Sequence, residues 1–249
     1  MLFRSGAGGF ESGTFTGSGW TTVNGSNNKW YVGTPQVPSA GTYGAYIDKN
    51  VAGPYQYNNT VAITSHFYRD IAFPAGATNI ILSFKWKCQG ESSFDFLQAF
   101  LVPTTTTPVA GIQLTSGQLG TNLNLNGGTT YSTATFTLSN TVAGTTKRLV
   151  FSWVNDGSLG AQPPAAVDEV SVTYSPPCSG TPTGGTTVTS SSGPCPNASF
   201  TLSLTGNSAG TGIAYQWKSS PTGSGYTNIS GATNATLTTD RKSTRLNSS

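Results

Sequence analysis

Apolar side chains in this chain recur at every second position, and no long stretch follows the i, i+3, i+4 spacing of an amphipathic helix. In residues 80–88, Leu82, Phe84, Trp86 and Cys88 alternate with polar or charged residues. Because successive side chains of a strand point to opposite faces, this spacing predicts a half-buried strand. Glycine, serine, threonine and asparagine are plentiful and suit strands and turns, while only 8% of residues are charged. The sequence therefore predicts an all-β chain.

Several further alternating runs follow the same pattern. The strongest lie at residues 60–73, 94–102, 133–139 and 148–154. With weaker runs they make about eight strands, which is enough for two packed sheets with aromatic side chains between them. Each fully buried Trp or Phe contributes about 2–3 kcal/mol, so such a core can be stable without disulfides. Cys88 is accordingly expected to be a buried thiol.

Residues 165–174, with the sequence A-A-V-D-E-V-S-V-T-Y, form the last alternating run of this module. Strict alternation places on one face Ala166, Asp168, Val170, Val172 and Tyr174. A carboxylate on a buried face needs a partner, because an unpaired buried charge is very costly. Glu11, at the other end of the module, is the candidate partner. Glu11 and Asp168 are therefore a candidate pair from the two ends of the module.

The opening motif G-F-E-S-G at residues 9–13, followed by Trp20, and the closing V-D-E-V-S-V resemble known modules. They are similar to the extracellular jelly-roll sandwiches of the MAM, cleaved-adhesin and carbohydrate-binding-module type, over residues 9–174. This resemblance implies that Glu11 and Asp168 share a structural Ca²⁺, with carbonyl groups from the turn at residues 48–50. Ca²⁺ takes six to eight oxygen ligands, so two carboxylates with carbonyls and water suffice. The alternative is that both are solvated carboxylates at strand ends.

Both ends of the chain resemble translated sequencing adaptor. Residues 240–249, D-R-K-S-T-R-L-N-S-S, match one adaptor strand over ten consecutive positions, and residues 1–5, M-L-F-R-S, match the other. We therefore set both segments aside in considering the fold. The natural sequence is expected to span residues 6–239 and to be cut at both ends. The alternative for residues 240–249 is a natural basic tail.

Without these segments the chain has no net charge. The 12 basic residues lose four and the 9 acidic residues lose one, which leaves eight of each. Nucleic acids and acidic membranes require clustered Lys and Arg, so neither is an expected partner. No apolar run approaches the roughly 18–20 residues of a membrane span.

A second module follows the first, which is expected to span residues 6–176. Residues 177–192 form a linker with the first edge strand, and residues 193–239 resemble the first half of an immunoglobulin-like domain from bacterial surface proteins. The resemblance rests on Y-Q-W, which supplies the core Trp217, and on N-I-x-G-A-T-x-x-T-L. The spacing from Cys195 to Trp217 is too long for the usual inter-sheet disulfide. Two pairings of Cys195 stay open: with Cys178, or with a cysteine lost beyond residue 239. This truncated domain is expected to be poorly stable.

The sequence contains no convincing set of catalytic residues. Ser65, His66 and Asp70 are close in sequence, but strand alternation directs them to different faces, so His66 is expected to be structural. A minor alternative to the metal site is that Glu11 and Asp168 act as a catalytic acid–base pair. No phosphate-binding glycine loop and no Cys/His metal cluster is visible. The chain is therefore expected not to be an enzyme.

A ligand site is expected in the loop at residues 50–59. Tyr55 and Tyr57 stand there beside Gln56, Asn58 and Asn59. Aromatic faces next to amide groups suit sugar rings, which present apolar C–H patches and a rim of hydroxyls. The alternative is that both are ordinary loop tyrosines.

Together these features predict a non-catalytic recognition or adhesion module of a larger secreted or cell-surface bacterial protein. Its expected partner is a glycan or a host or cell-surface protein, next to other domains of the same polypeptide. Two alternatives stay open: an accessory module of an extracellular hydrolase, and a spacer without a ligand.

Overall fold

The computed structural model describes residues 8–49, 53–120, 124–177, 180–193, 195, 197–208, 213–220 and 225–240, except the side chain of Asp240. The chain divides into two compact units, Met1–Ser175 and Pro176–Ser249. Within the described residues there is no α-helix, and the one helical element is the short 3-10 helix η1 (Asn140–Val142). No helix in this part of the chain has the length and apolarity to span a membrane. The predicted all-β class is confirmed.

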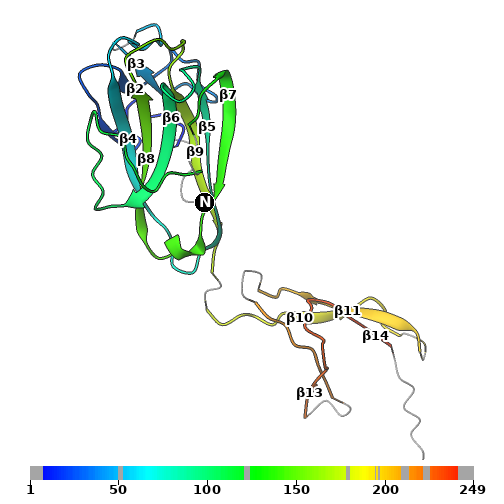
Figure 1. Ribbon diagram of the computed structural model, residues 1–249. Helices are drawn as coiled ribbons and strands as arrows, with labels where there is room; N and C mark the ends of the chain where they lie inside the picture. Colours follow the sequence, from blue (N-terminus) through cyan, green and yellow to red (C-terminus); the bar gives the residue numbers. More distant parts are fainter. Residues whose placement is uncertain are drawn as a thin grey trace, which may run out of the picture. The chain divides into compact units, whose positions relative to one another are not determined.

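The first unit is a sandwich of two antiparallel sheets (Figure 1). The four-stranded sheet has the order β1 (Thr21–Val23), β4 (Ile63–Ala72), β8 (Thr146–Asn155), β6 (Phe96–Pro103). The five-stranded sheet has the order β2 (Lys29–Gly33), β3 (Gly44–Asp48), β9 (Ala166–Ser175), β5 (Thr78–Cys88), β7 (Gly128–Thr137). Apart from β2 and β3, neighbouring strands in each sheet are not consecutive in the sequence, and the closing strand β9 lies in the middle of its sheet.

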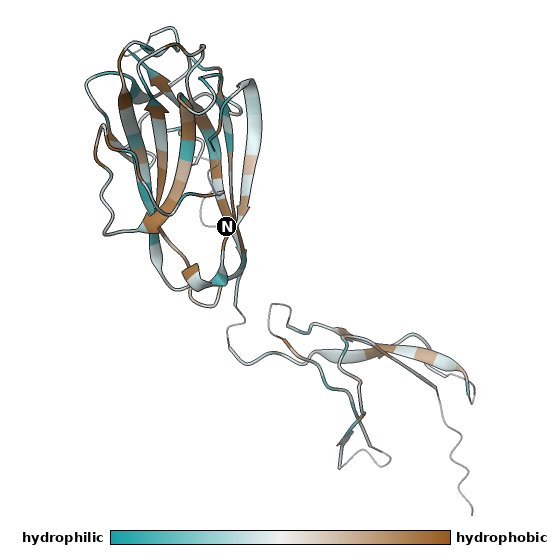
Figure 2. Cartoon of the chain, in the orientation of Figure 1, coloured by the Kyte–Doolittle hydropathy of each residue, from teal (hydrophilic) through white to brown (hydrophobic). Residues whose placement is uncertain are grey.

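The core between the sheets is aromatic. Phe67 on β4 is fully buried, and its ring contacts those of five other residues at centroid distances of 4.6–5.9 Å. These are Phe10, Phe15, Trp20, Trp30 and Phe151. Cys88 is also buried, as expected, and burial raises the pKa of its thiol. Figure 2 shows hydrophobic residues concentrated on β8, β6 and β9, whereas the threonine-rich β7 at the sheet edge is pale.

Strand β9 departs from strict alternation. Its register against β5 shifts next to Glu169, whose φ is 47°. Val167 packs in the core before the shift and Val170 packs there after it. Asp168 therefore points away from the core, to the face that carries Ala166. The prediction that Asp168 shares a face with Val170 is wrong, because a β-bulge inserts one residue and changes the side-chain phase.

The opening segment reaches β9 where β3 has ended. β3 pairs with β9 only at Ala45↔Val167 and Tyr46↔Ala166. Beyond these pairs, the N–H of Val170 donates to the carbonyl of Gly8 over 2.9 Å. The first and last segments of the unit thus lie side by side.

The second unit contains two small sheets. One has the order β10 (Thr186–Thr189), β11 (Ser199–Thr205), β14 (Leu237–Asp240), and the other pairs β12 (Lys218–Ser219) with β13 (Thr227–Asn228). Phe200, Leu202 and Leu204 on β11 are only half-buried, and Ala232 is the one buried apolar residue among those described in this unit. The immunoglobulin-like assignment stays a prediction. Cys195 is a free, exposed thiol, and Cys178 lies outside the described residues.

Because the second unit buries so little apolar surface, it is expected to be cleaved far faster than the first. Limited proteolysis of the whole chain with thermolysin should yield one persistent fragment that contains the aromatic core of residues 8–175. Mass spectrometry of the time course identifies the fragments. Equal survival of fragments from residues 180–240 would show that the second unit is stable in its present form.

Candidate ligand-binding site

Asp168 anchors the loop between β2 and β3, which we call the 34–43 loop. Its side chain is fully buried. Oδ2 accepts the N–H groups of Ser39 (2.8 Å) and Ala40 (3.2 Å), and Oδ1 accepts the N–H of Glu169 (2.8 Å). Burial raises the pKa of Asp168 to about 6, although the three N–H groups act in the opposite direction. A buried carboxylate is therefore used to fix a surface loop.

Glu11 holds the other end of the same loop. Its Oε2 accepts the N–H of Thr42 (2.9 Å) and its Oε1 accepts the N–H of Tyr43 (3.3 Å). A Cβ atom on Gly9 would lie 3.8 Å from Oε1 of Glu11 and 4.0 Å from Oδ1 of Asp168. The two carboxylates therefore border the same space, and the glycine between them leaves that space open. The structure brings together the two acidic residues that the sequence pairs.

The carboxylate oxygens of Glu11 and Asp168 could provide some of the ligands that a hard cation needs. Carboxylate oxygens are preferred Ca²⁺ ligands, and each accepts more than one contact, so the N–H bonds leave lone pairs on Glu11 and Asp168. The space that a Cβ on Gly9 would fill lies between them. In the described part of the chain, however, no group of three or more His, Cys, Asp and Glu side chains is arranged to hold a metal. Main-chain carbonyls and water would have to complete the shell.

A pocket of about 410 Å³ opens beside these carboxylates. It lies on the face of the five-stranded sheet that points away from the core, between the opening segment, the 34–43 loop and strands β5, β7 and β9. Its lining comprises Gly8, Gly9, Glu11, Ala40, Gly41, Ser83, Phe84, Lys85, Thr133, Glu169, Val170 and Ser171. The volume falls in the usual range for small-ligand sites.

The pocket carries charged groups of both signs beside apolar surface. Nζ of Lys85 donates to the hydroxyl of Thr133 over 2.9 Å, which leaves further N–H donors on the ammonium. Glu169 accepts a hydrogen bond from the hydroxyl of Ser39. Neither Glu11 nor Glu169 forms an ion pair among the described residues, where the one salt bridge joins Arg148 to Asp70. The pocket thus offers hydrogen-bond donors and acceptors within one small volume.

Tyr55 and Tyr57 do not form the expected sugar platform. Their side chains are 8% and 2% exposed, and both hydroxyls are bound inside the protein. Tyr55 donates to the carbonyl of Pro164 over 2.7 Å, and Tyr57 donates to Oδ2 of Asp95 over 2.5 Å. This corrects the prediction of an exposed aromatic pair, because the acceptors lie far away in the sequence and draw both rings inward.

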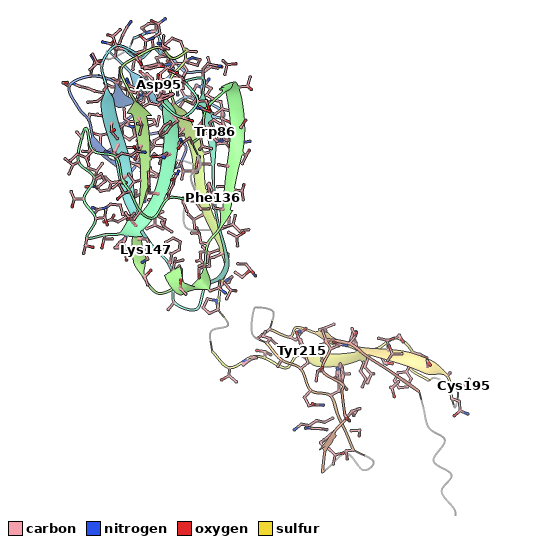
Figure 3. All side chains as sticks on the ribbon, in the orientation of Figure 1. Trp86, Asp95, Phe136, Lys147, Cys195 and Tyr215 are labelled. Atoms are coloured by element: carbon pink, nitrogen blue, oxygen red, sulfur yellow. The ribbon has the colours of Figure 1, made fainter. Side chains whose placement is uncertain are left out.

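Asp95 is a structural residue that the sequence analysis missed. It is fully buried, and besides Tyr57 it accepts the N–H of Asp156 over 3.1 Å. Burial raises its pKa, and burial together with the bond to Asp95 raises the pKa of Tyr57. Figure 3 shows Asp95 among the loops at the end of the first unit opposite Lys147. It fixes the loops at that end.

His66 is structural, as the sequence predicts. It is fully buried, with Nδ1 2.7 Å from the hydroxyl of Ser152 and Nε2 3.1 Å from the carbonyls of Val109 and Ile112. Two carbonyl acceptors at Nε2 require a proton there, so Ser152 donates to Nδ1. Burial lowers the pKa of His66.

The other residues near His66 in sequence are engaged elsewhere. Ser65 accepts the N–H of Gly25, and Asp70 pairs with Arg148. No triad is assembled from Ser65, His66 and Asp70.

Comparison with protein families gives one match. A domain of unknown function, DUF8696, matches residues 180–246, which lie in the second unit and include seven of the ten residues with adaptor-like sequence. A search of curated proteins found no match.

Comparison with solved structures gives matches that cover about two thirds of the chain. TmCBM61, solved in complex with beta-1,4-galactotriose, is 14% identical with a TM-score of 0.42, covering 67% of this chain and 94% of its own. The K1 cleaved adhesin domain of Lys-gingipain from Porphyromonas gingivalis W83 is 15% identical with a TM-score of 0.42, covering 66% and 95%.

A third match is to part of a much longer chain. The enzymatically active domain of bacteriophage CBA120 tailspike protein 4 is 13% identical with a TM-score of 0.41, and the match covers 70% of this chain and 21% of the tailspike chain. At such TM-scores the likeness carries no argument about ligand or activity. The β-sandwich assignment rests on the sheets themselves.

Proposed function

We propose that the first unit is a non-catalytic module that recognises a glycan in the 410 Å³ pocket. The observation that carries this proposal is the lining of the pocket. Ser83, Ser171 and Thr133 provide hydroxyls, Lys85 provides an ammonium, and Glu11 and Glu169 provide carboxylates. Sugars carry hydroxyls that donate and accept, so they match a lining of mixed donors and acceptors.

Gly9 in the pocket wall supports a ligand that approaches the backbone, because a Cβ there would have no neighbour closer than 3.7 Å. Gly8 and Gly41 also line the pocket, but their Cβ positions are taken by the carbonyl of Val170 and the carboxylate of Glu11. A position without a side chain exposes main-chain N–H and C=O groups to a ligand, and such groups often fix its orientation. Strands β5, β7 and β9 provide the floor, so most of the polar groups stand on rigid elements.

The absence of catalysis is proposed from the roles of the carboxylates. Asp168 is buried and accepts three N–H groups. Both oxygens of Glu11 accept main-chain N–H groups of the 34–43 loop. A general acid must be able to give its proton to the substrate, whereas these carboxylates accept hydrogen bonds from the protein itself.

Glycan binding is tested on the whole chain with a glycan array, followed by calorimetry on each hit. Lys85→Ala and Ser171→Ala are each expected to weaken binding about tenfold, because each removes a hydrogen-bonding group from the pocket. Thr22→Ala, on β1 of the other sheet, is the control and should bind as the wild type does. An array without any hit, or hits that bind these variants equally well, would contradict the proposal.

We also propose that Glu11 and Asp168 share a structural Ca²⁺, supported by their common border on the space beside Gly9. The ion would neutralise the carboxylate of Asp168, which burial removes from water, and would link the opening segment to β9. Chelation with EGTA is then expected to lower the melting temperature of the first unit by several degrees, and added Ca²⁺ should restore it. Glu11→Gln should remove the Ca²⁺ dependence. A melting curve that is the same with and without Ca²⁺ would rule out this role.

A secreted or cell-surface location and further domains in the same polypeptide complete the proposal. They are supported by the resemblance of the opening and closing motifs to extracellular modules. An accessory module of a hydrolase would use the same pocket, whereas a spacer would bind no glycan.

A further inference from the structure

The outward face of the five-stranded sheet continues past the pocket. Lys85 and Thr133 line the pocket, and two residues further along the same strands are Lys87 and Tyr131. Side chains two residues apart on a strand point to the same face, so this second pair extends the floor. The Nζ atom of Lys87 lies 4.5 Å from the ring centroid of Tyr131.

The 34–43 loop covers this extension. Nζ of Lys87 donates to the main-chain carbonyl of Gln36, and the side chain of Gln36 donates from Nε2 to the carbonyl of Gly33 over 2.9 Å. Lys87 is 8% exposed and Gln36 is 1% exposed. Burial lowers the pKa of Lys87. The part of the loop at residues 34–38, which we call the lid, therefore covers Lys87 beside the pocket.

The closed lid leaves polar atoms unsatisfied. Oε1 of Gln36 and the hydroxyl of Tyr131 are buried and have no hydrogen-bond partner within the described part of the chain. A buried polar atom without a partner destabilises the closed state. Both atoms belong to residues that contact the ammonium of Lys87, and a ligand with several hydroxyls can satisfy such groups. Gln36 is more than nine-tenths buried, so its unpaired oxygen faces the protein and not the solvent.

Polar contacts alone hold the lid. Of residues 34–42 only Gln36 is buried, and none of the nine belongs to an apolar core cluster. Val37 at the tip is 74% exposed and has a φ of 52°, which is unfavourable for a β-branched residue. A segment without apolar packing opens at a low free-energy cost.

We propose that Lys87, Tyr131 and Gln36 form a second sugar subsite beneath the lid, so that the pocket accepts an oligosaccharide and not only a single sugar. This inference rests on the proposed glycan function of the pocket. The first sugar lies beside Lys85 and Thr133. The next sugar unit of the glycan displaces the lid and packs against the ring of Tyr131. Its hydroxyls accept a hydrogen bond from Lys87 and donate one to Oε1 of Gln36.

The test uses the whole chain with six probes: galactose, xylose and glucose, and their β-1,4-linked trisaccharides. Calorimetry is expected to show at least tenfold tighter binding of one trisaccharide than of its monosaccharide. Tyr131→Phe and Lys87→Met should remove most of that gain and leave monosaccharide affinity within about twofold. Thr129→Ala, at an exposed position of β7, is the control and should keep the gain. Melting curves check that Lys87→Met is folded.

A second measurement needs no variant. In NMR spectra of the labelled wild type, the trisaccharide should shift the side-chain amide of Gln36 and the main-chain amide of Val37, while the monosaccharide should leave both unchanged. Equal binding of both sugars with these two signals unmoved would overturn the second subsite but leave the pocket's function standing. Failure of all six probes to bind would overturn this inference, and an array without any hit would overturn the glycan function as well.

Discussion

Phe67→Ala is expected to lower the free energy of unfolding of the first unit by about 4 kcal/mol, the largest effect of any single substitution considered. Phe67 is fully buried, and its ring contacts five other aromatic rings from both sheets and the opening segment. Its removal leaves a cavity that the surrounding rigid rings cannot close. Because whole domains are stable by about 5–15 kcal/mol, this loss should be plain in urea denaturation followed by tryptophan fluorescence.

Phe94→Ala is the matched control for this prediction. Phe94 is the same residue type but is 50% exposed in the turn before β6. Its replacement should change the free energy of unfolding by no more than about 0.5 kcal/mol. Similar losses for the two variants would show that the aromatic cluster around Phe67 is not the stabilising core.

Asp168→Ala is expected to cost about 3 kcal/mol and also to free the 34–43 loop. The substitution removes the acceptor of three N–H groups, those of Ser39, Ala40 and Glu169, in a fully buried position. Hydrogen exchange should show lost protection at Ser39 and Ala40, beyond the loss that global destabilisation causes.

Glu169→Ala serves as the control, because Glu169 is the next residue but is exposed and accepts only from the hydroxyl of Ser39. It should change stability by about 0.5 kcal/mol or less and leave the amide of Ala40 protected. If Asp168→Ala behaves in the same way, the buried carboxylate does not hold the loop.

The class of fold could be predicted from the sequence because it depends on a repeated local signal. Alternation in residues 80–88 appears as strand β5, and the aromatic residues of these runs fill the core. The orientation of Asp168 could not be predicted, since it depends on one bulge at Glu169, and a bulge leaves no periodic signal. The adjacency of Glu11 and Asp168 was predictable only through the resemblance of the two motifs.

The candidate ligand site could not be predicted from the sequence, for a different physical reason. Tyr55 and Tyr57 stand in a polar, loop-like segment, yet both are buried because Pro164 and Asp95 accept their hydroxyls. The pocket, in contrast, is assembled from glycines, serines and charged residues of five separate segments, none distinctive alone. These segments form one pocket because the carboxylates of Glu11 and Asp168 hold the 34–43 loop in place beside the sheet.

The central claim is that this carboxylate-anchored pocket binds a glycan. The most direct measurement is NMR chemical-shift mapping of the labelled chain during titration with the saccharide that binds best on the array. The claim predicts that the largest shifts lie at Ser83, Lys85, Thr133 and Ser171 and that they saturate together with the calorimetric signal. Saturating shifts confined to the opposite sheet or to the second unit would contradict it.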